Sequence, residues 1–149
     1  MATSSTNVFK IRSATLDDVP RVASNLRQDD LQEIVDGTGL NPVLSMSLAV
    51  LLDETIVFDA PDGKAAGIAG VDASGCIWMH CTNETQRYPL SFVKQARQWI
   101  DSLPHPILHN LADIRNTAHL KLLKHLNFKF LRVVPFGPHN LYFVEFVRL

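Results

Sequence analysis

Apolar and polar residues alternate along parts of this chain and recur at helical spacing along others, and these two patterns divide it into strands and helices. Alternating or continuous apolar runs predict strands at residues 8–12, 54–59, 65–71, 76–82, 107–112, 128–134 and 141–147. Apolar residues three and four positions apart predict helices at residues 15–26, 29–35, 42–51, 89–103 and 116–126. The order is strand, three helices, three strands, helix, strand, helix and a last pair of strands.

Turn and cap residues support these boundaries. Thr15 and Asn116 precede helical stripes and are preferred N-cap residues. Gly37 and Gly39 are expected to stop the second helix, and Asn127 suits the left-handed position that ends many helices. The Pro- and Gly-rich residues 135–138 are expected to form a loop between the last two strands.

Length and charge limit the possible classes of protein. With 149 residues and 46% apolar content, one core is expected, with residues 1–6 as a flexible tail and residues 7–149 as a single domain. The chain has 14 Lys and Arg against 15 Asp and Glu, so no basic field indicates nucleic acid as a partner. Because no apolar run approaches about 20 residues, no membrane span is expected. We expect a soluble, cytoplasmic protein.

Cysteine and histidine spacing gives no sign of a metal site or a disulfide. Cys76 and Cys81 are five residues apart near one predicted strand, so their side chains are expected on opposite faces. The six histidines are scattered and lack the compact spacing of metal ligands. Two free thiols and no metal are therefore predicted.

The order of elements and three segments resemble the GNAT superfamily of N-acyltransferases. KIRSATLDDVPRV is similar to the family's first strand and helix, and AAGIAGVDASGCIWMHCT to its hairpin and central strand. NTAHLKLLKHLNF matches the spacing of the motif NxxAxxxYxxxGF, with Asn116 and Phe128 at its ends. The resemblance implies an α/β fold, with a mixed, mostly antiparallel sheet of six or seven strands, about four flanking helices, and strands that splay at a cofactor cleft.

A narrower resemblance is to a small GNAT-like branch encoded by short-tailed phages, which includes internal virion proteins. It depends on NLRQDDLQEI, on the strand that carries Trp78, and on LHNLADIRN. It implies a location in the host cytoplasm or in the virion, and a host or virion protein as a possible partner.

The superfamily resemblance also implies acetyl-CoA as cofactor and an amine as acceptor. The family's pyrophosphate loop, Q/RxxGxG/A, aligns with Gln86, Arg87 and Ser91, but Pro89 replaces the first glycine and removes one amide donor. Arg87 can supply a guanidinium instead, or it is simply a solvated loop charge.

Three further cofactor contacts are implied by the resemblance. The backbone of Cys81 and Thr82, at the end of the central strand, would pair with the pantetheine arm. Asn116 would orient that arm, although a helix cap alone also explains it.

Acid and base candidates follow from the same alignment. Leu123 stands where many members carry the tyrosine that protonates the CoA thiolate, so His119, one turn away, or Tyr88 is a candidate donor. His80 shares one face of its strand with Trp78 and Thr82 and is a candidate general base, or an ordinary core histidine.

Glu33 would line the acceptor side if the first helices fold over the groove. Alternatively, the acidic cluster of Asp29, Asp30, Glu33 and Asp36 is a solvated helix face. A groove lined by these carboxylates would favour a cationic acceptor such as an amine.

Three functions stay open at this point. The chain is an acetyl-CoA-dependent N-acyltransferase, a GNAT-shaped structural protein without catalysis, or a modulator of a host protein. A homo-oligomer is a further possibility, because the alternating residues 141–147 can pair across a dimer or within the sheet of one chain.

Overall fold

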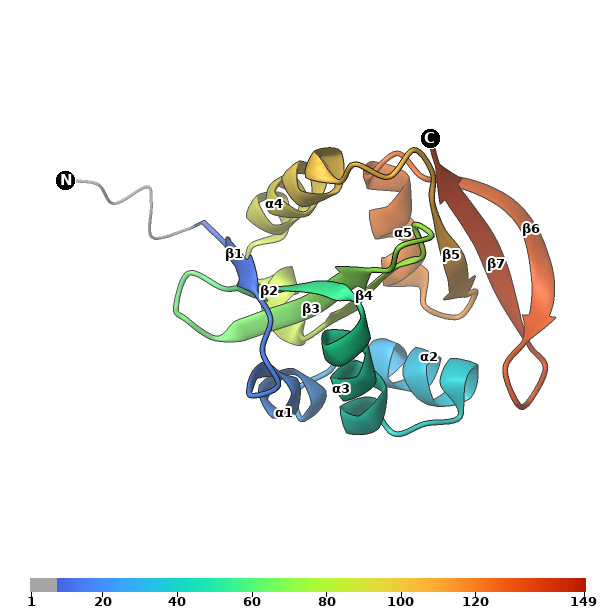
Figure 1. Cartoon of the computed structure of the whole chain (residues 1–149), viewed down its shortest axis with the longest axis horizontal. Helices are drawn as coiled ribbons and strands as arrows, with labels where there is room; N and C mark the ends of the chain where they lie inside the picture. The colour runs from blue at the N-terminus through green and yellow to red at the C-terminus, as the bar shows by residue number, and fades with distance from the viewer. Residues whose placement is uncertain (1–7) are drawn as a thin grey trace.

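The computed structural model describes residues 8–149 (Figure 1). The tail predicted at residues 1–6 lies outside the described residues. The elements follow in the order β1 (Lys10–Ser13), α1 (Asp18–Ala23), α2 (Gln28–Thr38), α3 (Pro42–Leu52), β2 (Glu54–Asp59), β3 (Ala65–Val71), β4 (Ile77–Cys81), the 3₁₀ helix η2 (Asn83–Gln86), α4 (Pro89–Ser102), β5 (Leu108–Asp113), α5 (Thr117–His125), β6 (Lys129–Phe136) and β7 (Leu141–Arg148). This is the predicted order, with boundaries shifted by a few residues.

The strands form two sheets rather than one. One sheet has the order β1-β2-β3-β4 and the other β5-β7-β6, and all their pairs are antiparallel. The sheets meet where Cys76 and His109 form an isolated parallel bridge and Asn110 Nδ2 donates to the Ile77 carbonyl at 2.8 Å. No ladder joins β4 to β5 beyond that point in the described residues, so the predicted splaying of the central strands is present.

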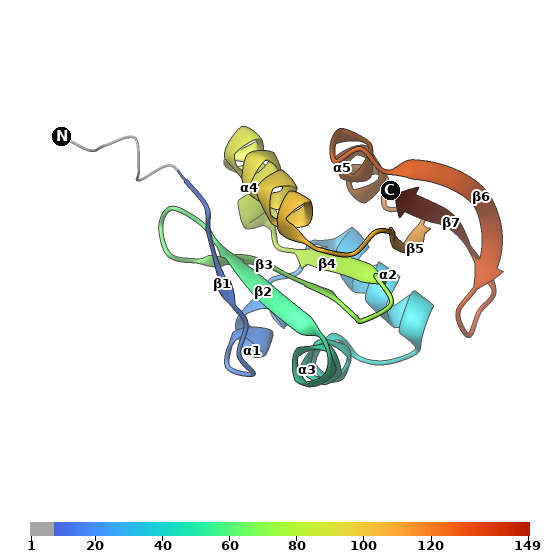
Figure 2. The ribbon, with the colours of Figure 1, turned by 45° about the horizontal axis from the view of Figure 1, so that its top comes forward.

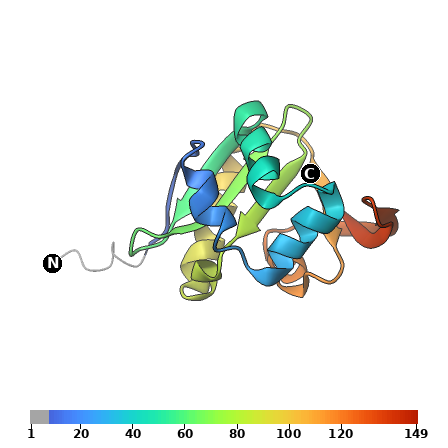
Figure 3. The same cartoon turned by 90° about the horizontal axis from the view of Figure 1, so that it is seen from below.

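Helices cover both faces of the four-stranded sheet, with α1 and α3 on one side and α4 on the other (Figures 1 and 3). A small apolar cluster around Met46 and Ile68 holds α1 and α3 to the sheet. A larger cluster holds α4, where Phe58 and Phe92 meet edge to face with ring centroids 5.2 Å apart. Helix α5 lies on the same side of the molecule as α4 (Figure 2). The helix α2 contacts both β4 and β5.

The predicted helix ends at Asn116 and Asn127 are confirmed, whereas the predicted cap at Thr15 is wrong, because α1 begins at Asp18 with Asp17 at its N-cap position. Asn116 Oδ1 accepts a hydrogen bond from the His119 amide at 3.3 Å at the start of α5. Asn127 follows this helix with φ of 69°. Of the two glycines predicted to stop α2, Gly39 is confirmed, because α2 continues past Gly37 to Thr38 and ends at Gly39, whose φ of 72° suits glycine.

The last two strands differ from the prediction in two ways. Pro135 and Phe136 belong to β6, not to a loop, because β6 is an edge strand whose outer side needs no amide donor. β7 lies between β5 and β6, so both of its edges are already paired. The predicted pairing of residues 141–147 across a dimer is therefore wrong, and the alternative of an ordinary strand within one chain is confirmed.

Residues 8–149 give three further observations. No single helix among them is long and apolar enough to cross a membrane, although the bent pair of α2 and α3 reaches that length and composition together. No three His, Cys, Asp or Glu side chains in this range lie close enough to hold a metal ion. Cys76 and Cys81 are both free thiols.

Candidate active site in the gap between the sheets

Two carboxylates of α2 fill the gap where β4 and β5 separate. Asp30 Oδ2 accepts a hydrogen bond from the amide of Cys81, the last residue of β4, at 2.7 Å. Glu33 Oε1 accepts one from the amide of Asp113, the last residue of β5, at 3.1 Å. Both acidic residues are buried, with exposed fractions of 3% and 9%. A solvated face is therefore wrong for these two members of the acidic cluster, whereas the Asp29 side chain is 44% exposed.

The buried carboxylate of Glu33 holds a histidine of α5. His119 Nδ1 lies 3.4 Å from a Glu33 carboxylate oxygen, and its ring meets Phe146 edge to face at 6.4 Å. Burial alone would lower the pKa of His119, but the charge and hydrogen bond of Glu33 outweigh it and raise the pKa. In turn, burial raises the pKa of Glu33, and the neighbouring His119 charge reverses this and lowers it. The two groups therefore favour an ion pair.

A second histidine, His80 of β4, faces the same region from the other side. Its ring stacks on Trp78 with centroids 5.3 Å apart, which confirms that these two side chains share one face. His80 Nδ1 is buried and has no hydrogen-bond partner among the described residues. Burial lowers the pKa of His80 more strongly than the charges of Asp30 and Glu33 raise it. The lowered pKa favours the neutral form of His80, whereas the raised pKa of His119 favours its charged form.

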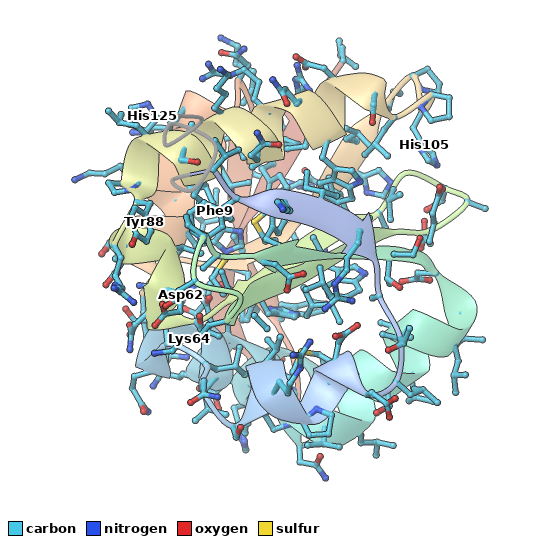
Figure 4. All side chains as sticks on the ribbon, turned by 90° about the vertical axis from the view of Figure 1, so that its left-hand side faces the viewer. Phe9, Asp62, Lys64, Tyr88, His105 and His125 are labelled. Atoms are coloured by element: carbon cyan, nitrogen blue, oxygen red, sulfur yellow. The ribbon has the colours of Figure 1, made fainter. Side chains whose placement is uncertain are left out.

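A groove of about 600 Å³ runs between α4 and α5 and reaches the gap. Cys81, Asp30 and His119 contribute to its lining. We call it the α4–α5 groove. Its other polar and charged lining residues are mostly basic. They come from the N-cap of α2 and from η2, α4 and α5, and are Arg27, Thr85, Gln86, Lys94, Arg97, Lys121 and His125. Figure 4 labels His125 beside α4, and the Arg97 guanidinium donates to the His125 carbonyl at 2.6 Å.

A second cavity, of about 260 Å³, lies on the opposite side of the gap, between α2, α3, β4 and the β6–β7 hairpin. We call it the α2–α3 cavity. His80, Trp78 and Glu33 line it. Met79 and His119 line both this cavity and the α4–α5 groove. Met79 and His119 therefore lie between the two spaces, where the strands splay.

Several solved acetyltransferase structures have a similar fold. An acetyltransferase of the GNAT family from Streptococcus pneumoniae is 17% identical, with a TM-score of 0.64 over 95% of this chain and 98% of that one. A GCN5-related N-acetyltransferase from Kribbella flavida is 18% identical, with a TM-score of 0.65 over 95% and 97%. The fold is that of the GNAT acetyltransferases.

A third GNAT structure was solved with acetyl-CoA. It is a phosphinothricin acetyltransferase from Sinorhizobium meliloti, 13% identical, with a TM-score of 0.63 over 95% of this chain and 88% of that one. No protein-family model matches this sequence, and no curated protein matches it. At these identities the similarity establishes the GNAT fold alone.

The predicted pyrophosphate loop of the GNAT fold is only partly at the groove. Gln86 lines the α4–α5 groove, as does Pro89 at the first turn of α4. Arg87 points elsewhere, and its guanidinium pairs with Asp62 at 3.1 Å and Glu84 at 3.0 Å. Ser91 Oγ accepts a hydrogen bond from the Phe9 amide at 3.2 Å. Their contact with a cofactor stays a prediction.

Three other predicted cofactor residues have their polar groups occupied inside the protein. The Cys81 amide is bonded to Asp30, and the Thr82 hydroxyl donates to the Ala66 carbonyl at 3.2 Å. Asn116 Nδ2 donates to Asp30 Oδ1 at 2.7 Å, while its Oδ1 caps α5. Asn116 is thus a cap that also holds Asp30. A cofactor would have to displace these bonds to reach any of the three directly.

Of the four predicted catalytic residues, three lie together and one does not. Glu33, His80 and His119 all line the α2–α3 cavity. Tyr88 lies at the N-terminus of α4, against Phe9, with ring centroids 6.1 Å apart (Figure 4), and it lines neither space. The prediction of Tyr88 as an acid in the site is therefore not supported by its position.

Asp30 was expected only as one member of the acidic cluster, and Met79 was not among the expected site residues. Asp30, Glu33 and Ile34 follow helical spacing and share the inward face of α2, so the pattern contained a signal. That signal was weak because aspartate on a helix is usually exposed.

Proposed function

We propose that this protein is an acetyl-CoA-dependent N-acetyltransferase. The observation that supports this is that His119 lines two spaces, one on each side of the splayed strands of a GNAT fold. A cofactor in the α4–α5 groove and an amine in the α2–α3 cavity would approach each other there. Direct transfer between them needs no covalent intermediate on the enzyme.

The α4–α5 groove suits the chemistry of CoA. Its basic side chains Lys94, Arg97 and Lys121 favour a polyanion, and the apolar Phe92 and Val93 suit the pantetheine arm. At the start of α4, Phe92 is the first residue whose amide donates to a backbone carbonyl, that of Tyr88. The amides of Leu90 and Ser91 come before it and are available to phosphate oxygens. Bound acetyl-CoA would supply an acetyl group activated as a thioester.

The two histidines divide the proton transfers. Neutral His80 faces the cavity and accepts a proton from the substrate ammonium, which leaves the amine nitrogen free to attack the thioester carbonyl carbon. The carbon–sulfur bond then breaks, and protonated His119 donates its Nε2 proton to the thiolate. The new amide nitrogen loses its second proton, which restores His119, and His80 releases its proton to solvent. Opposite shifts of two neighbouring pKa values are typical of such an acid–base pair. His119 would thereby replace the tyrosine whose position Leu123 occupies in the core.

One observation favours the alternative function. The Cys81 amide, on the open edge of β4, already has Asp30 as its acceptor, and Pro89 removes a donor from the start of α4. These features also fit a phage protein in which the GNAT fold serves in the virion or binds a host protein without catalysis. The host cytoplasm or the virion would then be its location.

Calorimetric titration with acetyl-CoA separates the two functions. We expect binding near the micromolar range, about −8 kcal/mol. Lys121→Glu reverses an exposed groove charge and should weaken binding about tenfold. Lys10→Glu is the matched control, because Lys10 is exposed on β1 and lines neither space, and it should leave the affinity within twofold.

Two outcomes would contradict the enzyme proposal. One is no heat of binding together with no rise in melting temperature at millimolar acetyl-CoA. The other is binding that Lys121→Glu and Lys10→Glu weaken equally, because this would place the cofactor outside the groove.

A further inference from the structure

The α2–α3 cavity has a composition that selects among amines, and this goes beyond its role as an acceptor site. Aromatic rings form much of its wall, from Trp78 and His80 on β4 and from Phe136, Phe143 and Phe146 on the hairpin. Glu33 and Asp53 contribute carboxylates. No Lys or Arg in the described residues lines it.

The wall at Asp53 is held in place by neighbouring residues. Trp78 Nε1 donates to Asp53 Oδ2 at 3.1 Å, and the indole stacks on His80. Gly70 on β3 makes room for the indole, because a Cβ atom there would lie only 2.6 Å from Trp78 Cζ2. No described residue donates to Asp53 Oδ1, so one carboxylate oxygen remains for a ligand.

His80 adds an unpartnered polar atom beside the cavity. Its Nδ1 is buried without a partner, although buried polar atoms in proteins are nearly always hydrogen-bonded. The ring lines the cavity, and the neutral imidazole can accept a hydrogen bond but carries no charge to repel a cation. The cavity therefore offers an aromatic surface, an acceptor and negative charge.

The volume limits the size of the ligand. At about 260 Å³, the cavity is smaller than the 300–1,000 Å³ typical of drug-sized ligands. An apolar cavity of about 150 Å³ is enough for a benzene ring. The remainder suits a short aminoalkyl chain and excludes a second ring system.

We propose that the α2–α3 cavity binds a small primary amine with a single aromatic or compact apolar body and no carboxylate. The inference rests on the proposed function in treating this amine as the acetyl acceptor. The aromatic walls bind the body, and Asp53, whose charge is not paired with a described cation, attracts the ammonium and repels an amino acid's carboxylate. A polyamine lacks the apolar body and leaves the aromatic walls poorly covered. Trp78 and Asp53 are thus specificity-determining residues.

Fluorescence tests the binding without any need for catalysis. Trp99, the second tryptophan, is buried in the core, so the Trp99→Phe protein reports on Trp78 alone. We expect 2-phenylethylamine to change this fluorescence saturably. Phenylalanine, which adds only a carboxylate, and spermidine, which lacks the ring, should each bind at least tenfold more weakly.

Two variants locate the site. Asp53→Asn keeps an acceptor for the indole but removes the charge, and should weaken 2-phenylethylamine about fivefold. Glu54→Gln removes the adjacent carboxylate, which is exposed and lines neither space, and should leave binding unchanged. Equal effects of the two variants, or equal affinity for all three probes, would overturn the proposal.

A thiol-release assay with acetyl-CoA and the same probes separates this inference from the proposed function. Faster acetylation of spermidine or phenylalanine than of 2-phenylethylamine would overturn the substrate class and leave the transferase intact. Selective binding of 2-phenylethylamine with no acetyl transfer would support the cavity as an amine site and contradict the transferase.

Discussion

Removal of the Glu33 charge should lower the pKa of His119. Glu33 lies 3.4 Å from His119 Nδ1, and both side chains are about one-tenth exposed, so solvent screens the pair little. An opposite charge at such a distance shifts a pKa by about 1–3 units, or roughly 1.4–4 kcal/mol. Without it, burial dominates, and the pKa of His119 should fall below its ordinary value of 6.5.

Proton NMR of the imidazole Cε1–H signal measures this shift directly, with Glu33→Gln as the variant. His119→Gln assigns the signal by removing it. Asp29→Asn is the matched control, because it neutralises a carboxylate of the same helix whose side chain is 44% exposed. We expect a fall of at least 1 unit in the Glu33→Gln protein and no change in the control.

The same pair makes the stability of the folded protein depend on pH. Because the pKa of His119 is raised, its contribution is fully present below pH 6.5 and is lost as the pH rises through the folded-state value. Because the pKa of Glu33 is lowered, its contribution is present above pH 4.5 and is lost as the pH falls through the folded-state value. The wild-type advantage over Glu33→Gln in urea unfolding should therefore peak between these values.

A His119 titration that does not move in Glu33→Gln would refute this reasoning. So would a stability difference that grows steadily from pH 6.5 to pH 9. Either result would mean that the two side chains do not form an ion pair, and it would remove the basis for His119 as the acid.

Three further predictions concern single residues. Leu123→Tyr introduces a tyrosine at a buried position that is 5% exposed. It should lower the free energy of unfolding by about 1–3 kcal/mol through overpacking and should not increase thiol release. A more active variant would contradict the placement of residue 123 in the core. Asn116→Ala removes both the cap of α5 and the hydrogen bond to Asp30. It should lower the free energy of unfolding, measured in urea, by about 3 kcal/mol. A loss under about 1 kcal/mol would indicate that Asn116 acts as a cap alone. Burial raises the pKa of both thiols, but Cys76 is half-buried and Cys81 is buried, so peptide mass spectrometry should show iodoacetamide on Cys76 first and on Cys81 only after unfolding.

Local signals in the sequence were sufficient for most of the elements. The cap at Asn116 and the left-handed residue Asn127 fix the ends of α5 within a few residues, and both act through neighbours in the chain. Pro135 misled the prediction, since a proline can occupy an edge strand and the sequence alone does not reveal which strand is at an edge.

The site was harder to predict because its contacts join distant parts of the chain. Glu33 and His119 were both named as candidates, but as separate ones, and nothing in their spacing indicates the hydrogen bond between residues 86 positions apart. From the sequence alone Asp30 resembles a surface carboxylate, because its hydrogen-bond partners in β4 and at Asn116 are distant in the chain. Tyr88 was chosen for its place in a loop, and only the structure shows that it packs against Phe9 instead.

The bonds from α2 to the ends of β4 and β5 have a consequence for the order of folding. Asp30 reaches across 51 positions to Cys81, and Glu33 across 80 positions to Asp113. Contacts of such high sequence separation close large loops, whose entropy cost must be met by structure formed earlier. We therefore expect both sheets to form before α2 docks between them. Hydrogen exchange at these two amides would follow that late step, which completes the walls of both spaces.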